Sequence, residues 1–261
     1  MFVTTAGRTN EEMIEQAKKV ANDLGCLYVP RKKKTVKQLM GRLNDSCIVV
    51  GKERIELHPL LGKAPFFFHP SSATFRMIRL LRGEKDPLIE ASQLTKGMTF
   101  LDCTMGMGSD SIVASLIVGR TGNVTALEGN KYIAYIVQNG LKRWTFDHQE
   151  MDEAMRRVYV INERYESFLK KQRDNSFDVV YFDPMFEQTI DESSGLSGLK
   201  RLAIYDDITE NMIEEALRVA KNRVVLKDYH RSSRFKRFGF HVYRRPSASF
   251  HYGVLTKNER Y

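Results

Sequence analysis

Residues 177–182 read Phe-Asp-Val-Val-Tyr-Phe, a short and nearly continuous apolar run that ends at Asp183 and Pro184. A run of this length and texture is typical of a strand that is buried on both faces of a parallel sheet. Such a strand requires helices above and below it. This stretch therefore predicts an α/β fold.

Strands and helices alternate along the chain on both sides of this run. Strands are expected at residues 100–102, 123–128, 158–161 and 223–226, and helices at 110–118, 132–144 and 209–220, while 241–243 and 249–255 form a possible antiparallel hairpin. This order predicts a doubly wound, mostly parallel sheet over residues 97–261, closed by the antiparallel hairpin. Ligands of such sheets lie at the carboxyl ends of the strands.

The part of the chain before this sheet has a different pattern of apolar residues, caps and turns, which predicts a small α+β domain over residues 1–69. Thr9-Asn10 offers a cap for a helix that is expected to end at Gly25. Residues 47–50 and 54–57 flank a glycine-containing turn, as the strands of a hairpin do. Residues 70–96 have a helical pattern and are expected to form a connector.

Composition limits the classes of protein that are possible. The chain has 261 residues, of which 42% are hydrophobic and 28% charged, a balance that favours a globular fold over disorder. It contains no apolar run of about 18 residues and no secretory signal, so we expect a cytoplasmic protein without a membrane segment. The three cysteines and six histidines show no metal-binding spacing, so no metal is expected.

The net charge of +9 suits a polyanionic partner. Basic residues cluster at 31–34, 76–82 and 231–245. In the last cluster they alternate with aromatic residues, namely Tyr229, Phe235, Phe238, Phe240 and Tyr243. Lysine and arginine neutralise phosphates and aromatic rings stack on unpaired bases, so RNA is the favoured partner. A helix that packs its phenylalanine face on a core has the same pattern.

A glycine-containing loop, running from Asp102 through Gly106 and Gly108 to Asp110, follows the strand expected at 100–102. Glycine lets the backbone approach a ligand closely. Glu128 ends the next strand, 128 − 108 = 20 residues after the last of these glycines, where a carboxylate accepts hydrogen bonds from ribose hydroxyls. The pattern predicts a ligand that contains adenosine, the alternative being a purely structural turn.

The charge of this loop distinguishes between the adenosine ligands. NAD favours a third glycine at the start of the helix, where this chain has Ser111. Asp102 would repel a pyrophosphate but suits a cationic group such as the amino group of a methionine moiety. S-adenosylmethionine is therefore favoured over NAD. Cys103 lies in the cofactor loop and is expected to pack in the core and not to act as a nucleophile.

The tetrapeptide Asp183-Pro184-Met185-Phe186 lies where the catalytic chemistry is expected. A carboxylate and a backbone carbonyl can accept the two N–H groups of a planar amine and orient its delocalised lone pair. Pro184 stiffens the turn and has no N–H of its own. Phe186 can stack on a base taken out of its stack. An Asp-Pro turn is equally common without function, so this interpretation depends on the upstream loop and Glu128.

These segments together resemble the RsmJ-type family of ribosomal RNA guanine-N2 methyltransferases and a related set of Gram-positive proteins. The resemblance covers roughly residues 97–230 and lies in Asp102-x-Thr-x-Gly-x-Gly-x-Asp110, in Glu128 and in Val180 to Phe186. It implies a class I, Rossmann-like methyltransferase core with a small N-terminal domain. It also implies S-adenosylmethionine as cofactor and a guanine amine of small-subunit ribosomal RNA as target.

The resemblance also assigns site residues by position. Cofactor contacts fall on Ser109, Asp110, Glu128, Gly129, Arg164, Tyr165 and Asp183, beside the loop residues Asp102, Gly106 and Gly108. The chain departs from the family at several of these: Ser109 and Gly129 replace arginines, and Arg164-Tyr165 replaces small hydroxyl residues. The departures affect the expected substrate more than the expected cofactor.

Other interpretations stay open. A nicotinamide-dependent oxidoreductase shares the glycine loop and Glu128 but does not account for Asp183 and its neighbours. A non-catalytic RNA-binding or ribosome-assembly protein on a methyltransferase scaffold would explain the basic charge. A methyltransferase of another amine is also compatible with the site. Residues 188–199, rich in serine and glycine, are either a loop that closes over the substrate or a solvated loop.

Overall fold

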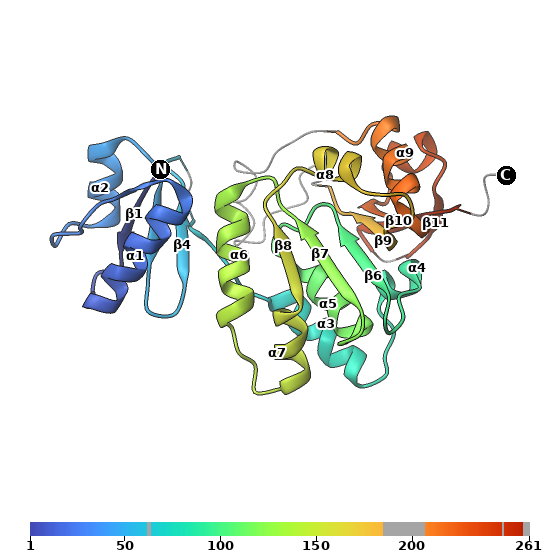
Figure 1. The fold of residues 1–261 in the computed structure, drawn as a ribbon, viewed down its shortest axis with the longest axis horizontal. Helices are drawn as coiled ribbons and strands as arrows, with labels where there is room; N and C mark the ends of the chain where they lie inside the picture. The colour runs from blue at the N-terminus through green and yellow to red at the C-terminus, as the bar shows by residue number, and fades with distance from the viewer. Residues whose placement is uncertain (62–63, 185–206, 247, 258–261) are drawn as a thin grey trace. The chain divides into compact units, whose positions relative to one another are not determined.

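The computed structural model describes residues 1–61, 64–184, 207–246 and 248–257, which form two compact units (Figure 1). The first unit contains residues 1–69 and 130–140. The second contains residues 70–129 and 141–184 and those described after residue 206.

The second unit is built on one seven-stranded sheet of order β11-β12-β10-β9-β6-β7-β8. Its strands are β6 (Thr99–Asp102), β7 (Asn123–Leu127), β8 (Val158–Ile161), β9 (Phe177–Phe182), β10 (Ala220–Tyr229), β11 (His241–Tyr243) and β12 (Phe250–Thr256). Strands β8, β7, β6, β9 and β10 are parallel, whereas β12 is antiparallel to both β10 and β11. The predicted doubly wound sheet with a closing antiparallel hairpin is confirmed.

Helices cover both faces of this sheet (Figure 1). On one face, α5 (Ser109–Val118) packs on β6 and β7 and contacts α3 (Ser71–Leu81), α4 (Pro87–Ser92) and α7 (Gln149–Arg156). On the other face lie α8 (Tyr165–Lys171), α9 (Glu210–Val219) and α10 (Ser233–Arg237), which contribute to one apolar cluster. α6 (Lys131–Arg143) falls in the first unit as far as Gly140.

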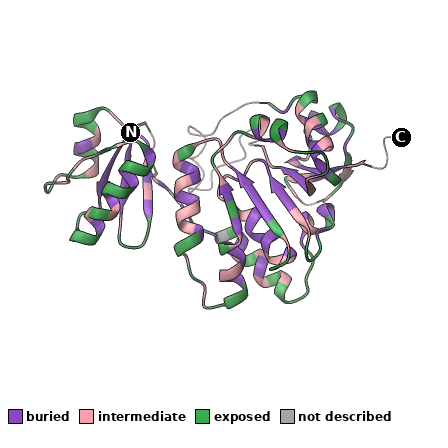
Figure 2. Ribbon diagram, viewed as in Figure 1, coloured by how far each residue is buried: buried purple, intermediate pink, exposed green. Residues whose placement is uncertain are grey.

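The run that predicts the fold, β9, lies between the two helical layers. Its residues 179–182 are all fully buried (Figure 2). Side chains alternate between the faces of a strand. Val180 and Phe182 join the cluster on the side of α8 and α9, whereas Tyr181 points toward α5 and donates a hydrogen bond to Asp110. Both faces of this strand are therefore occupied.

Three aromatic residues of the basic C-terminal stretch belong to this core. Phe235, Phe238 and Phe240 are each at most 7% exposed and pack in the cluster under α9 and α10. They are not available to stack on a base, so that interpretation is wrong for these three residues. The alternative, a phenylalanine face packed on a core, describes them correctly.

Residues 1–69 of the first unit form a five-stranded sheet of order β2-β1-β3-β4-β5 with helices α1 and α2. Its elements are β1 (Phe2–Thr5), α1 (Glu11–Leu24), β2 (Leu27–Tyr28), α2 (Val36–Leu43), β3 (Cys47–Val50), β4 (Ile55–His58) and β5 (Phe66–Phe67). Asn10 caps α1 by accepting a 2.9 Å hydrogen bond from the Met13 amide. Gly25 ends the helix with a left-handed φ of 62°. β3 and β4 form the predicted antiparallel hairpin.

Neither a helix that could cross a membrane nor a cluster of metal-binding side chains is present among the described residues. None of the helices in this part of the chain combines the length and the apolar character that crossing a membrane requires. Within the same residues, no group of three or more histidine, cysteine, aspartate or glutamate side chains is arranged to hold a metal ion.

The packing of β12 on α10 predicts a strict size limit at Gly253. A Cβ atom there would lie 2.7 Å from the Phe235 ring and 2.8 Å from Phe240 Cβ. Gly253→Ala should therefore lower the free energy of unfolding by about 1–3 kcal/mol, measured by urea denaturation. As a control, Gly41→Ala on α2, where nothing lies within 4 Å, should raise it slightly, by about 0.5 kcal/mol. Unchanged stability of Gly253→Ala would contradict the described packing.

Candidate active site

The carboxyl ends of the central strands bring three predicted segments together. The Cys103 amide donates to the Tyr181 carbonyl at 2.9 Å, and the Met105 amide donates to the Leu127 carbonyl at 2.9 Å. The Asp183 amide donates to Thr104 Oγ1 at 2.6 Å. These bonds connect the glycine loop after β6 to the ends of β7 and β9. The loop, Glu128 and Asp183 therefore lie at one edge of the sheet, as the sequence predicts.

The glycine loop presents backbone and few side chains. Gly106 and Gly108 have left-handed φ values of 51° and 78°, which glycine adopts without strain. The nearest atom to a Cβ built on Gly106 is the Thr104 carbonyl oxygen at 4.0 Å, so this position is open. Gly108 is also the cap residue of α5, whose first amides point toward the loop. The loop can therefore accept a ligand close to its backbone.

Asp102 is buried beneath this loop, only 1% exposed. Its Oδ1 accepts a 3.0 Å hydrogen bond from the Thr104 amide, and its Oδ2 accepts a 2.6 Å bond from Ser111 Oγ. Burial raises the pKa of Asp102 to about 7, although the bonds from Ser111 and Thr104 oppose the shift. Asp102 thus fixes the shape of the loop. Its direct contact with the cofactor remains a prediction.

Asp110 points into the molecule and away from the loop. It forms an ion pair with Arg76 of α3, accepts a 2.8 Å hydrogen bond from the Tyr181 hydroxyl, and lies 3.2 Å from Lys227 Nζ. Burial disfavours its charged form, but Lys227 and Arg76 outweigh this effect and hold the pKa of Asp110 well below its usual range. Arg76 is fixed in turn by Asp86, at 2.7 and 2.8 Å.

Lys227, on β10, connects this cluster to Asp183. Its Nζ lies 2.6 Å from Asp183 Oδ2, and its side chain is 16% exposed. Burial disfavours the ammonium form, but Asp110 and Asp183 overcome this and raise the pKa of Lys227, which therefore stays charged. Burial raises the pKa of Asp183 to about 6, an effect that Lys227 opposes and Asp110 strengthens.

The two oxygens of Asp183 differ in their surroundings. Oδ2 is paired with Lys227, whereas Oδ1 accepts no hydrogen bond from any residue in the described part of the chain. The side chain is 27% exposed. One oxygen is therefore anchored by a buried cation, and the other is available to an incoming N–H group.

The remaining predicted cofactor residues follow the first three strands of the unit. Ser109 begins α5 and its hydroxyl accepts a 2.7 Å bond from Ser72. Glu128 is partly exposed after β7, and the carbonyls of Glu128 and Gly129 accept bonds from the Asn162 side chain at 2.7 and 3.2 Å. These residues share the carboxyl edge with the glycine loop.

Arg164 and Tyr165 lie at the start of α8, after β8. Arg164 is paired with Glu166 at 2.7 Å. The Tyr165 ring packs edge-on against Phe182, with 5.5 Å between centroids. Pro184 is the last described residue of its segment. Phe186 and the loop 188–199 lie outside the described residues.

Sequence reasoning missed Lys227 and Arg76. Lys227 had a signal, because it directly follows the apolar run Val224–Leu226 at the end of a strand that feeds the same edge. Arg76 had none, since it is one of several arginines in a helix with no motif. The structure therefore adds two cations to the carboxylates that the sequence identified.

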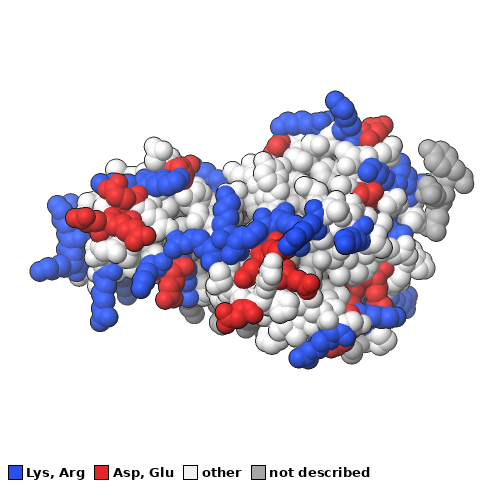
Figure 3. Space-filling model, turned by 60° about the horizontal axis from the view of Figure 1, so that its bottom comes forward, with Lys and Arg blue, Asp and Glu red and all other residues white. Residues whose placement is uncertain are grey.

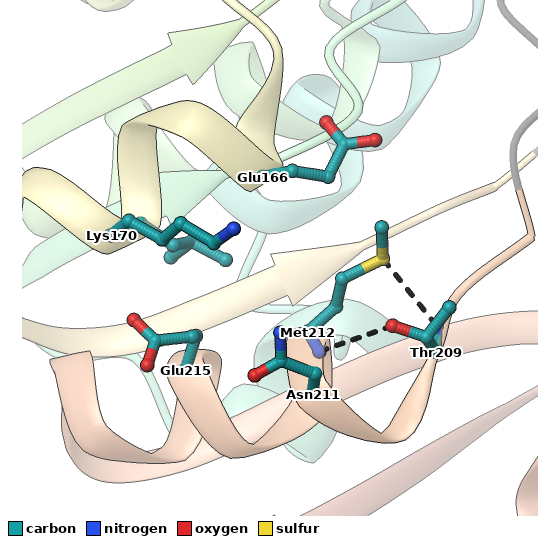
Figure 4. Close-up of a pocket in the computed structure, with 7 residues that line it drawn as sticks. Glu166, Lys170, Thr209, Asn211, Met212 and Glu215 are labelled. Atoms are coloured by element: carbon teal, nitrogen blue, oxygen red, sulfur yellow. Dashed lines mark hydrogen bonds between the residues drawn. The ribbon is translucent and has the colours of Figure 1, made fainter.

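A small pocket lies between α8 and α9 (Figure 4). It is lined by Glu166, Leu169, Lys170, Thr209, Asn211, Met212 and Glu215. Its volume of about 60 Å³ is well below the roughly 300 Å³ at which small-molecule sites begin. It is too small for an adenosine.

This strand order, with a glycine loop after the first strand of the unit and an acidic residue after the second, defines a class I methyltransferase. A family model described as "Putative SAM-dependent methyltransferase" matches residues 34–239, most of the chain. The chain belongs to this family. S-adenosylmethionine is accordingly its cofactor.

Known relatives are consistent with this assignment. The chain is 46% identical to the uncharacterized protein YpiP of Bacillus subtilis over 97% of its length and 98% of that protein. It is 25% identical to ribosomal RNA small subunit methyltransferase J of Legionella pneumophila over 86% of each chain. The same enzyme of Hydrogenovibrio crunogenus is 30% identical, over 56% of this chain and 53% of that protein.

The fold has a counterpart among solved structures. A SAM-dependent methyltransferase from Neisseria gonorrhoeae superposes with a TM-score of 0.61 over 99% of this chain and 97% of that one, at 18% sequence identity. This likeness shows the fold of the chain, in agreement with the sheet order and the crossover connections.

The ionic cluster predicts that Asp110 stabilises the fold in a pH-dependent way. Asp110→Asn leaves Arg76 and Lys227 with less negative charge, and should lower the free energy of unfolding at pH 7 by about 3 kcal/mol. Because the folded-state pKa of Asp110 is depressed, this contribution is complete above the unfolded pKa of about 4 and is lost at lower pH. Chemical denaturation at several pH values should therefore show the variant and the wild type converging below about pH 4.

The control for this experiment is Asp174→Asn, which breaks an ion pair with Arg218 in which the aspartate is 68% exposed. Its effect should be below about 1 kcal/mol. An equally small effect at Asp110, or a gap between Asp110→Asn and wild type that does not depend on pH, would show that the cluster does not support the fold.

Proposed function

We propose that the protein transfers a methyl group from S-adenosylmethionine to an exocyclic amine of RNA. The most specific form of the proposal is a guanine N2 of small-subunit ribosomal RNA. One observation carries it: no described residue donates a hydrogen bond to Asp183 Oδ1 at the carboxyl edge, while Lys227 fixes the other oxygen at 2.6 Å. When bound, the cofactor supplies an electrophilic methyl group on a sulfonium.

The chain's own residues provide orientation and charge. The lone pair of an exocyclic amine is delocalised into its ring and is a poor nucleophile. Asp183 Oδ1 accepting one N–H, and the Pro184 carbonyl accepting the other, would turn the amine toward the methyl donor and increase its electron density. Lys227 keeps Asp183 in the carboxylate form near neutral pH, which is the stronger acceptor. Phe186 is proposed to stack on the target ring.

The proton balance does not require a strong base. The nitrogen is cationic once it carries the new methyl group, and its proton then has a low pKa. It can leave to solvent or to the Asp183 carboxylate, which is 27% exposed. The site therefore does not need the histidine or cysteine that other transfer reactions use.

The residues at the edge fit the cofactor. Gly106 leaves its backbone accessible, Gly108 lets the chain turn into α5 with a left-handed φ, and Glu128 is a partly exposed carboxylate one strand away. The proposed cofactor-binding set is Asp102, Gly106, Gly108, Ser109, Asp110, Glu128, Gly129, Arg164, Tyr165 and Asp183. Within this set, the contacts of Asp102 and Asp110 favour indirect roles: Asp102 shapes the loop and Asp110 positions Lys227.

Charge and relatives support RNA as the substrate. The net charge of +9 favours a polyanion, and several relatives at 25–34% identity are named ribosomal RNA small subunit methyltransferase J. An enzyme that acts on ribosomal RNA works in the cytoplasm, and this is the location that we propose.

The role of Asp183 predicts a separation of binding from turnover. Asp183→Ala should keep the Kd for S-adenosylmethionine, measured by calorimetry, within about tenfold of wild type, since the glycine loop and Glu128 are intact. Transfer of a labelled methyl group to small-subunit ribosomal particles should fall by about a hundredfold or more. Asp174→Ala, far from the edge, is the matched control and should retain full turnover.

Near-normal turnover of Asp183→Ala would contradict this mechanism. Cofactor binding by the wild type without transfer to any RNA fraction would instead favour a non-catalytic RNA-binding protein on the same scaffold.

A further inference from the structure

Basic side chains alone do not mark an RNA surface on this protein. Figure 3 shows lysine and arginine side chains distributed over the face that it presents, with acidic groups between them. Two further criteria are needed: cations without acidic partners, and a position next to Asp183. The ends of β10 and β12 meet both.

We propose that His230, Arg231, Arg244 and Arg245, here called the basic edge, bind an RNA phosphate beside the target nucleotide. The inference rests on the proposed function, because it extends the site around Asp183 to the substrate backbone. His230 and Arg231 follow β10, whereas Arg244 and Arg245 follow β11 in the connection to β12.

The two connections are held together by described contacts. The His230 amide donates to the Ser249 carbonyl at 3.1 Å, and the Arg245 amide donates to His251 Nδ1 at 3.3 Å. The His230 and His251 rings meet edge-on with 5.9 Å between centroids. These contacts bring the connection after β10, which carries Arg231, next to the connection after β11, which carries Arg244.

Phe250 links this surface to the catalytic carboxylate. In the register of β10 and β12, Phe250 lies opposite Tyr229 and Tyr252 lies opposite Lys227, so the four side chains share the face that α5 covers. Lys227 Nζ lies 5.0 Å from the Phe250 ring centroid and 2.6 Å from Asp183 Oδ2. One lysine thus touches both the carboxylate and the ring.

Arg245 is held on the same ring. Its guanidinium carbon lies 4.8 Å from the Phe250 centroid, a cation–π contact that fixes the planar group. Its Nη1 is shielded from solvent and donates to no acceptor in the described chain. A buried donor without a partner costs stability, and an anion that accepts from it would remove that cost.

The charges around Arg245 favour binding of an external anion, because the described carboxylates nearby do not already neutralise them. Arg231 and Arg244 are exposed, and neither forms an ion pair with another described residue. Asp228, the acidic residue nearest in sequence, is 1% exposed and paired with Arg234 at 2.9 Å. Arginine clusters of this kind bind phosphate through paired N–H donors.

An aromatic surface beside the arginines identifies the anion as part of a nucleic acid. The Tyr229 and His230 rings lie 4.3 Å apart and are both partly exposed. Rings next to a phosphate site accept unpaired bases by stacking. The ligand is therefore an unpaired stretch of the RNA, whose next nucleotide can enter at Asp183.

The test measures binding of a labelled single-stranded oligoribonucleotide containing guanosine to the full-length protein over a range of salt concentrations. Arg245→Met should raise the Kd roughly threefold to tenfold and reduce the slope of log Kd against log salt by about one, the signature of a lost phosphate contact. Phe250→Leu should raise the Kd and keep the slope nearer to wild type, because the charges remain. Arg173→Met removes an exposed charge before β9, at the opposite edge of the sheet, and should change neither quantity.

The possible outcomes distinguish a failure of the basic edge from a failure of the proposed function. Unchanged Kd and slope in Arg245→Met would overturn the basic edge, even if the wild type methylates RNA. Displacement of the oligoribonucleotide by equimolar inorganic phosphate at constant ionic strength would also overturn it, by showing a site for a free anion. Binding that depends on Arg245, in a protein that methylates no RNA, would support the edge and contradict the proposed function. If Arg245→Met unfolds, Arg245→Lys keeps the charge without the paired donors and should still weaken binding.

Discussion

The ammonium group of Lys227 is buried between two carboxylates, and much of the site depends on this arrangement. Its Nζ lies 2.6 Å from Asp183 and 3.2 Å from Asp110. A buried charge is tolerated only when it is paired and hydrogen-bonded. Here the pairing also connects elements: Asp110 lies in the first turn of α5, Lys227 lies near the end of β10, and Asp183 follows β9. A cation at this point holds the edge of the sheet in place, and within the described residues it leaves one oxygen of Asp183 without a hydrogen bond.

The fold of the second unit could be predicted from sequence because its signals are local. Apolar runs and helical spacing recur in residues 97–230, and the run at 177–182 has the texture of a strand covered on both sides. Elements with weak periodicity were missed. β1 lies inside the first sheet, between β2 and β3, yet Phe-Val-Thr-Thr carries no alternation of apolar and polar residues, and its burial comes from its neighbours. α7 has a strongly charged exposed face.

Part of the candidate site could likewise be predicted from the sequence, and part could not. Glycines and carboxylates that directly follow strands were identified, because the topology of a parallel sheet sends them to one edge. The directions in which those carboxylates point could not be predicted. Asp102 points under its loop, and Asp110 points at Arg76 and Lys227. The partners of Asp110 lie 34 to 117 residues away in sequence and leave no local pattern. The sequence also does not show that the phenylalanines of the basic stretch pack in the core, or that Phe250 lies beside the site. Both placements come from the structure.

The central chemical claim is that the methyl group is transferred to an exocyclic nitrogen. The most direct measurement is nucleoside mass spectrometry. Small-subunit ribosomal particles from a strain that lacks the protein would be incubated with it and with isotopically labelled S-adenosylmethionine, then digested to nucleosides. The account predicts the label on an amine, with N2-methylguanosine as the expected product. Label on a ring carbon or a ribose oxygen, or in protein alone, would contradict it.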